Sequence, residues 1–244
     1  MKILAFFVEG QTEQIFIKWL LIKIANQKNK NVSLKIKKFK GGGRKMPEIE
    51  ESINEQLQFF IEPQNPFFEV LIYNCGQDVA VKSRILENIN TLFEIGCTEI
   101  IGIQDLIPNY SLSELNQVKR GLKFISPDNL PLQIPFEIII MVHETEAWFL
   151  AEVKHLNKFD SRLTNLYINT ELGFDPFQDD MRLRVKPAKD LNDIYQLVGR
   201  GYSKKERQVN KIMELLDFHN LYLNIRHKIP ELEELIQKID SFLV

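Results

Sequence analysis

The chain has 244 residues, of which 44% are hydrophobic and 26% are charged. This composition is that of an ordered globular protein and excludes a disordered chain. The formal net charge of −2 excludes a global attraction to nucleic acid, so any such binding needs a local basic patch. The two cysteines, Cys75 and Cys97, are too few and too far apart for a zinc site or a disulfide framework, and they fit a reducing compartment.

The N-terminal residues give no sign of export. They lack the basic region and the cleavage site of a signal peptide, and the apolar run at 2–8 reaches Glu9 too early for a membrane span. We therefore expect a cytoplasmic protein without a membrane partner.

Apolar runs and helical patterns alternate along the first two-thirds of the chain. Strands are predicted at 2–8, 32–39, 67–73, 98–104 and 136–142. Helices are predicted at 12–26, 46–61, 79–95 and 111–123, the third of them closed by Gly96. Strands that are mostly separated by helices predict an α/β fold, with a largely parallel central sheet and helices on both faces.

Helical patterns dominate from about residue 153 onward, as at 204–217 and 230–243. No strand is predicted there, and the apolar faces of these helices need a surface to cover. We therefore predict an α/β domain over residues 1–152 and a helical C-terminal extension over residues 153–244 that packs on it.

Acidic residues follow several of the predicted strands. In a parallel sheet, ligands bind beyond the carboxyl ends of the strands, so these acids are candidate site residues. They are Glu9, Asp78, Asp105, Glu144 and Glu146. Carboxylates that converge at one sheet edge suit Mg²⁺ or Mn²⁺, which can stabilise charge at a phosphate and activate water.

Most of these acids also have a structural interpretation. Glu9 could simply favour the N-terminus of the helix that follows, with Thr12 as its cap, and Asp105 could be a turn residue. Glu144 and Glu146 are two positions apart, so we expect only one of them to face the same ion. Local sequence does not decide between ligand and cap for Glu9.

Residues 28–45 contain basic side chains and no acidic one. The basic residues are Lys28, Lys30, Lys35, Lys37, Lys38, Lys40, Arg44 and Lys45. A basic strand that leads to the glycine loop at 41–43 could follow a phosphodiester backbone, or it could be an edge strand protected by lysines. We predict nucleic-acid contacts from Lys37, Lys38, Lys40, Arg44 and Lys45, and from Lys189 further along the chain.

Five segments occur in an order that resembles the DUF4276 family of prokaryotic proteins. They are VEGQTEQIF (8–16), IIGIQDLIP (100–108), MVHETEAWFLAE (141–152), KPAKDL (186–191) and GYSKK (201–205). That family is considered related to the Toprim fold, the metal-binding domain of topoisomerases, primases and overcoming-lysogenization-defect nucleases. By this resemblance Glu9 matches the glutamate that ends the first Toprim strand, and Asp105 matches the first aspartate of a D-x-D motif. Ile107 stands where the second aspartate belongs.

The resemblance implies a Mg²⁺- or Mn²⁺-dependent nuclease, or a related phosphoryl-transfer enzyme, that acts on nucleic acid in phage defence or a mobile element. A partner protein from the same system is a further expectation. Glu9 would be a metal ligand or general base, Asp105 with Glu144 or Glu146 would be ligands, Asp78 is a further candidate ligand, and Lys204 would contact phosphate. The missing second aspartate favours the alternative, a non-catalytic binding or regulatory subunit that keeps the fold.

Overall fold

The computed structural model describes residues 1–39, 50–59, 67–76, 81–107, 109–122 and 134–244, and it gives only the backbone of 38, 39 and 50–59. The chain forms two compact units. The first unit consists of Met1–Ile140 and Gln237–Val244, and the second unit consists of Met141–Ile236.

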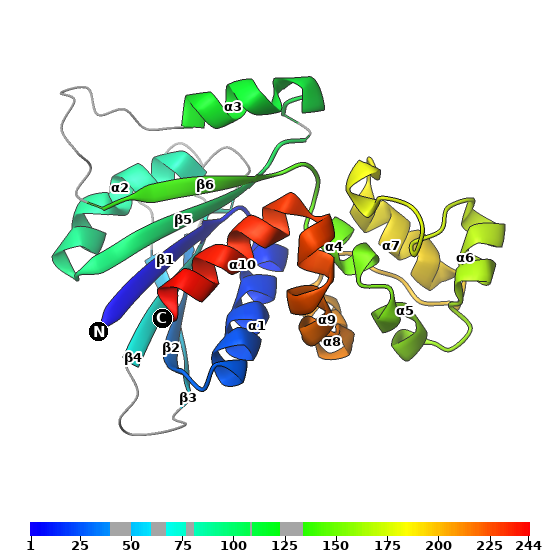
Figure 1. Cartoon of the computed structure of the whole chain (residues 1–244), viewed down its shortest axis with the longest axis horizontal. Coiled ribbons are helices and arrows are strands. Elements are labelled where there is room, and N and C mark those ends of the chain that lie inside the picture. The colour runs from blue at the N-terminus through cyan, green and yellow to red at the C-terminus, as the bar shows by residue number, and fades with distance from the viewer. Residues whose placement is uncertain (40–49, 60–66, 77–80, 108, 123–133) are drawn as a thin grey trace. The chain divides into compact units, whose positions relative to one another are not determined.

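The first unit is an α/β fold built on a sheet that has six strands in the described residues, in the order β3-β2-β4-β1-β5-β6 (Figure 1). The strands are β1 (Lys2–Val8), β2 (Asn31–Phe39), β3 (Glu50–Phe59), β4 (Phe67–Asn74), β5 (Cys97–Asp105) and β6 (Phe136–Met141). β1 runs parallel to β4 and β5, β2 runs parallel to β4, and β3 runs antiparallel to β2. The central sheet is therefore largely parallel, as predicted.

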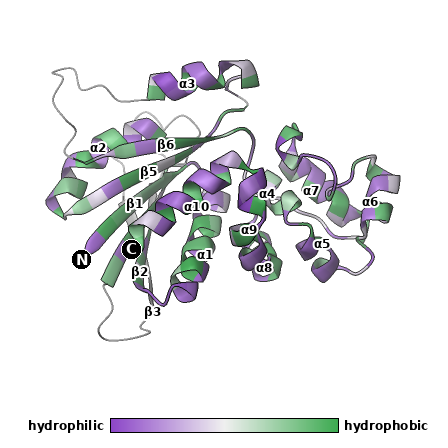
Figure 2. Ribbon diagram, in the orientation of Figure 1, coloured by the Kyte–Doolittle hydropathy of each residue, from purple (hydrophilic) through white to green (hydrophobic). Residues whose placement is uncertain are grey.

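Helices cover both faces of this sheet. They are α1 (Gln11–Gln27), α2 (Val81–Glu94), α3 (Leu115–Leu122) after the short turn η1 (Leu112–Glu114), and the end of α10 (Pro230–Phe242). Ile3, Ala5 and Phe7 of β1 pack with α2 in one apolar cluster. Because successive side chains of a strand point to opposite faces, the intervening residues of β1 face the other side, where α1 packs on β2 and β4. Figure 2 shows the central strands as predominantly hydrophobic, which fits strands that are buried on both faces.

One predicted helix, at 46–61, is wrong, because residues Glu50–Phe59 form strand β3. The apolar residues of this segment fit a helical spacing as well as the alternation of a strand. Pairing with β2 decides between the two, because the antiparallel register sets Ile53 opposite Ile36 and Leu57 opposite Leu34. The segment therefore gains a ladder of backbone pairing with β2.

The end of the chain, Gln237–Val244, belongs to the first unit. The Phe242 ring packs edge-on against Phe68 of β4, with 5.2 Å between the ring centroids. Asp240 lies 3.0 Å from the Lys28 ammonium, and Lys238 lies 2.7 Å from the Glu137 carboxylate. The two units also divide between residues 140 and 141, whereas the sequence predicts a boundary at 152.

The second unit is helical in the residues described. Its elements are α4 (Glu146–Ala151), α5 (Lys154–Phe159), α6 (Asn165–Leu172), η2 (Met181–Leu183), α7 (Pro187–Gln196), α8 (Glu206–Leu215), α9 (Phe218–Leu223), η3 (Ile225–Lys228) and the start of α10. Within the described ranges of both units, no helix combines the length and hydropathy of a transmembrane span.

Candidate functional site

Glu9 and Asp105 are joined at the carboxyl ends of two neighbouring strands. Glu9 follows the last residue of β1 and is 6% exposed, and Asp105 is the last residue of β5. The Asp105 backbone N–H donates to Glu9 Oε1 over 2.8 Å. Because β1 and β5 are parallel, both acids lie at the same edge of the sheet.

The helix after Glu9 is not capped as one interpretation of the sequence supposed. α1 begins at Gln11, and its N-cap is Gly10, which offers no side chain to the free N–H groups of the first turn. Thr12, the predicted cap, lies inside the helix and is buried. The hydrogen bond from Asp105 therefore gives Glu9 a role that reaches across the sheet, beyond its own helix.

Cys75 marks the end of β4 on the other side of β1. Its backbone N–H donates to the Val8 carbonyl over 2.8 Å, which ties the two strand ends together. Burial raises the pKa of the Cys75 thiol to about 12, the Arg84 guanidinium lowers it, and the Glu9 carboxylate raises it. The thiol is thus protonated and inert at neutral pH, and Arg84 of α2 and Glu9 both lie close enough to act on it electrostatically.

The donor set at this edge fits a hard divalent cation only in part. No three His, Cys, Asp or Glu side chains in the described ranges are grouped so as to hold a metal ion. Mg²⁺ is commonly bound through one or two carboxylates, with waters and substrate phosphates as the other ligands. Glu9 and Asp105 offer two carboxylates at this edge, and the contact that joins them runs through the Asp105 backbone N–H; Asp78 lies outside the described residues.

Ile107 occupies the position where the resemblance expects a second aspartate. It packs against the apolar cluster of Leu106, Val118 and Ile140 beneath α3. An aspartate at this position would meet apolar neighbours, so Ile107 is a packing residue here.

Glu144, Glu146 and Lys204 meet within the second unit. The Lys204 ammonium lies 2.8 Å from Glu144 Oε1 and 3.1 Å from Glu146 Oε2. Both acids therefore face the same ammonium, while the expectation that only one of them faces a metal ion stays a prediction. Glu144 precedes α4 and Glu146 is its first residue, so the chain turns here and the alternation of a strand does not apply.

Two further contacts hold these carboxylates in place. The Tyr202 hydroxyl donates to Glu146 Oε1 over 2.6 Å, and the Ala188 backbone N–H, in the first turn of α7, donates to Glu144 Oε2 over 3.1 Å. A carboxylate at the N-terminus of a helix is stabilised by the helix dipole. The segments that begin at 141, 186 and 201, three of those that carry the family resemblance, thus converge on one polar cluster.

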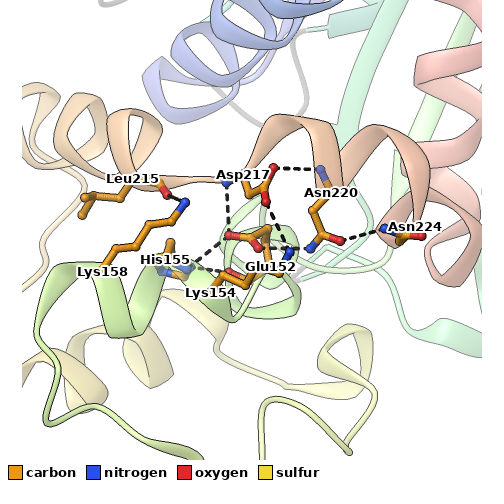
Figure 3. A network of polar contacts seen from close by, with 8 residues as sticks. All are labelled: Glu152, Lys154, His155, Lys158, Leu215, Asp217, Asn220 and Asn224. Atoms are coloured by element: carbon orange, nitrogen blue, oxygen red, sulfur yellow. Dashed lines mark hydrogen bonds and ion pairs between the residues drawn. The ribbon is translucent and has the colours of Figure 1, made fainter.

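A second polar network in this unit surrounds Glu152 (Figure 3). The Glu152 carboxylate is fully buried and accepts hydrogen bonds from the Asp217 and His155 backbone N–H groups and from the Asn220 amide, over 3.3, 3.2 and 3.1 Å. Burial raises the pKa of Glu152, while the hydrogen bonds from Asp217 and Asn220 lower it. The network joins α5 to α9 through a buried charge.

His155 is a neutral, fully buried member of the same network. Its Nδ1 lies 2.6 Å from the Glu152 carbonyl oxygen, so Nδ1 carries the proton and donates it. Nε2 is buried and has no hydrogen-bond partner in the described part of the chain. Burial lowers the pKa of His155 to about 4.

His155 makes the free energy of unfolding depend on pH. The unfolded chain protonates this histidine below pH 6.5, its ordinary pKa, and the folded chain does so only near pH 4, so stability falls as the pH drops through this window. We expect His155 to remove about 2 kcal/mol between pH 7 and pH 5. Urea unfolding at the two pH values should show a smaller loss in His155→Phe than in the wild type. Equal losses would contradict the burial of a neutral imidazole; Glu152, whose pKa is raised, acts with the opposite sign in both proteins.

The predicted nucleic-acid contacts fall in several places. Lys37 of β2 donates to the Tyr73 hydroxyl over 3.2 Å and lies over the Tyr73 ring. Lys189 is exposed on α7 of the second unit and pairs with Asp193. Lys40, Arg44, Lys45 and the glycine loop at 41–43 lie outside the described residues, and so does the side chain of Lys38.

Two residues of the first unit were missed by the sequence analysis. Arg84 is one, and its only signal was its place in the first turn of a helix that follows a strand end. Gln14 is the other: its amide donates to the carbonyls of Lys37 and Ile72, over 2.8 and 3.0 Å, and so ties α1 to β2 and β4. A glutamine next to the apolar run at 15–17 of the predicted helix was the available signal.

Comparison with protein families matches residues 8–240 to the model described as domain of unknown function DUF4276. No curated protein and no solved structure matches the chain.

Proposed function

The chain belongs to the DUF4276 family, and we propose that it is a metal-dependent nuclease, or a related phosphoryl-transfer enzyme, whose acidic site lies in a Toprim-like first unit. Nucleic acid would be its substrate, and Mg²⁺ or Mn²⁺ its cofactor. A setting in phage defence or a mobile element, with a partner protein from the same system, rests on the family resemblance alone.

One observation carries the proposal: the hydrogen bond that holds Glu9 against Asp105 at the carboxyl edge of the sheet. β1 lies between β4 and β5. The chain first forms β2, β3 and β4 on one side of β1 and then crosses to form β5 on its other side. Ligand sites of open α/β sheets form at such places. The bond also fixes the Glu9 carboxylate relative to β5 before any ligand binds, as a preorganised site requires.

The residues at this edge of the sheet could have different roles in phosphodiester hydrolysis. Glu9 and Asp105 would hold the ion, which when bound supplies positive charge to the phosphate and lowers the pKa of water. Glu9 could alternatively take the proton of an attacking water, because it is anchored through one oxygen. Arg84 adds a guanidinium close to this edge, and guanidinium groups stabilise charge on phosphoryl oxygens.

Glu144, Glu146 and Lys204 keep their place in the proposal as predicted site residues of the second unit. Their mutual ion pairs support a different use as well, in which the cluster stabilises that unit. The rival function is a non-catalytic binding or regulatory subunit, and the apolar packing of Ile107 favours it.

A cleavage assay with the purified chain tests the proposal. Labelled single-stranded and double-stranded DNA and RNA would be incubated with Mg²⁺, with Mn²⁺ and with a chelator. We expect cleavage of at least one substrate that needs the metal, and anomalous density next to Glu9 and Asp105 in a crystal soaked in Mn²⁺. Binding without cleavage under every metal condition, together with no density at these carboxylates, would favour the non-catalytic subunit.

A further inference from the structure

A cavity of about 290 Å³ opens in the first unit, between the end of β5 and α3. Its lining residues are Gln104, Tyr110, Glu114, Gln117, Val118, Gly121 and Leu122. Gln104 directly precedes Asp105, so this cavity borders the acidic edge of the sheet.

Gln104 is the unusual member of this lining. It is 5% exposed, and its amide atoms are not among the buried polar atoms that lack a partner in the described part of the chain. Gln104 lines the cavity, and a glutamine amide offers both donors and an acceptor. A ligand that enters the cavity can therefore hydrogen-bond to this amide.

The strand register sets Gln104 beside Glu9. Val8 is opposite Ile103 in the parallel pair of β1 and β5, so Glu9 and Gln104 each directly follow this last pair, and the Asp105 backbone N–H contacts the Glu9 carboxylate. A Cβ atom at Gly102 would meet Val81 of α2, so Gly102 faces α2, and Gln104, two positions later, points to the same side. A ligand of Gln104 would therefore lie next to the carboxylate of the proposed site.

The other walls suit a flat aromatic ligand. Val118 is buried and Leu122 is half-buried, so together they give an apolar surface, and Tyr110 is 40% exposed and offers a ring for stacking. Lys119 and Arg120 are exposed on α3, near the part of the chain that lines the cavity. Stacking on an aromatic ring with basic residues nearby is the usual way in which proteins bind an unpaired nucleotide.

We propose that this cavity binds an unpaired adenine base of the nucleic-acid substrate, next to the phosphodiester at Glu9 and Asp105. The Gln104 amide offers one donor and one acceptor side by side, and this pattern matches the N6 and N7 edge of adenine. Tyr110 stacks on the base and sets affinity, while Gln104 sets the preference for adenine. The inference rests on the proposed function and names the feature of the substrate that the site recognises.

The test is oligonucleotide binding without divalent metal, so that cleavage does not enter. Fluorescence anisotropy would compare short single strands that contain adenine, cytosine, guanine or thymine at the centre, as DNA and, with uracil in place of thymine, as RNA. We expect the wild type to prefer adenine by about tenfold, in line with the discrimination of a bidentate amide contact. Gln104→Leu should lose this preference, and Tyr110→Ala should bind every strand about tenfold more weakly while Tyr110→Phe binds normally.

Two controls keep this result specific. Gln196→Leu removes an exposed glutamine of the second unit and should leave the preference unchanged. Gln104→Leu should also keep the melting temperature of the wild type, because leucine puts an apolar side chain in place of one that is only 5% exposed, so a loss of preference would not reflect unfolding.

Several outcomes would overturn the inference. These are no strand bound by the wild type, no preference for adenine, a preference that survives in Gln104→Leu, or AMP bound as tightly as the adenine strand, which would assign the cavity to a free nucleotide. Cleavage without an adenine preference would remove the cavity from the mechanism but leave the nuclease. An adenine preference without any cleavage would keep the cavity as a binding site for adenine and remove the nuclease.

Discussion

Glu9→Gln is expected to lower metal-dependent cleavage by at least about a hundredfold, the loss typical when metal coordination is disturbed. The substitution removes the negative charge that would hold the ion. It keeps an oxygen in the position of Oε1, so the hydrogen bond from the Asp105 backbone N–H can persist. The melting temperature should therefore be unchanged or slightly higher, because the substitution removes a charge from a side chain that is only 6% exposed. Cleavage rates and thermal melts on the same preparation measure both effects.

Glu9→Ala is the matched variant that separates chemistry from structure. It removes charge and acceptor together and leaves the Asp105 N–H without its partner, at a cost of about 1–3 kcal/mol. Asp105→Asn, which keeps its own backbone donor, should lose activity as Glu9→Gln does. If Glu9→Gln destabilised the fold as much as Glu9→Ala does, or cleaved normally, Glu9 would have only a structural role.

Lys204→Met is expected to reduce the free energy of unfolding by about 3 kcal/mol. Glu146 is fully buried, and the Lys204 ammonium is the cation beside its Oε2. Removing this ammonium takes a positive charge away from a buried carboxylate, whose other oxygen accepts a hydrogen bond from the Tyr202 hydroxyl. Methionine keeps the length of the side chain, and it inherits the same left-handed backbone, at φ 55°, so backbone strain does not change between the two proteins. Urea unfolding measures the difference.

The double variant Lys204→Met with Glu146→Gln supplies the control, because it removes both charges. We expect it to recover most of the lost stability, since replacing a buried ion pair by neutral groups is far less costly than breaking it. Lys205→Met, at an exposed neighbouring lysine, should change stability by no more than about 0.5 kcal/mol. A stable Lys204→Met protein would show that the ion pairs contribute little, and would support the alternative in which Lys204 serves phosphate.

The sequence predicted most elements because their patterns are local. β1 is a continuous apolar run and was predicted at its observed bounds, and Gly96 ends α2 at φ 80° as a glycine cap should. β3 could not be predicted in the same way, because its strand character comes from pairing with β2. The periodicity of this segment alone gives no information about its partner strand β2.

The candidate site was predictable at the level of strand ends and no further. That Glu9 and Asp105 lie together follows from a parallel sheet, which the alternation of strands and helices predicts. The pairing of Lys204 with Glu144 and Glu146 joins residues about 60 positions apart, and no local pattern encodes it. Gln104 escaped notice because a glutamine at the end of a strand is unremarkable until its burial is known.

The antiparallel strand β3 changes what the lysines of β2 can be for. Among the described strands, β3 and β6 hold the two outer positions of the sheet, and β2 is enclosed between β3 and β4. Lysines that prevent another chain from pairing with a sheet are found on edge strands, and β2 is not an edge strand. Its lysines instead belong to a face of the sheet, where Lys35 pairs with Glu69 and Lys37 rests on Tyr73. At this edge of the sheet, the strand that needs protection against aggregation is therefore β3. The positive charge of β2 is available for internal pairing or for a ligand that approaches this face.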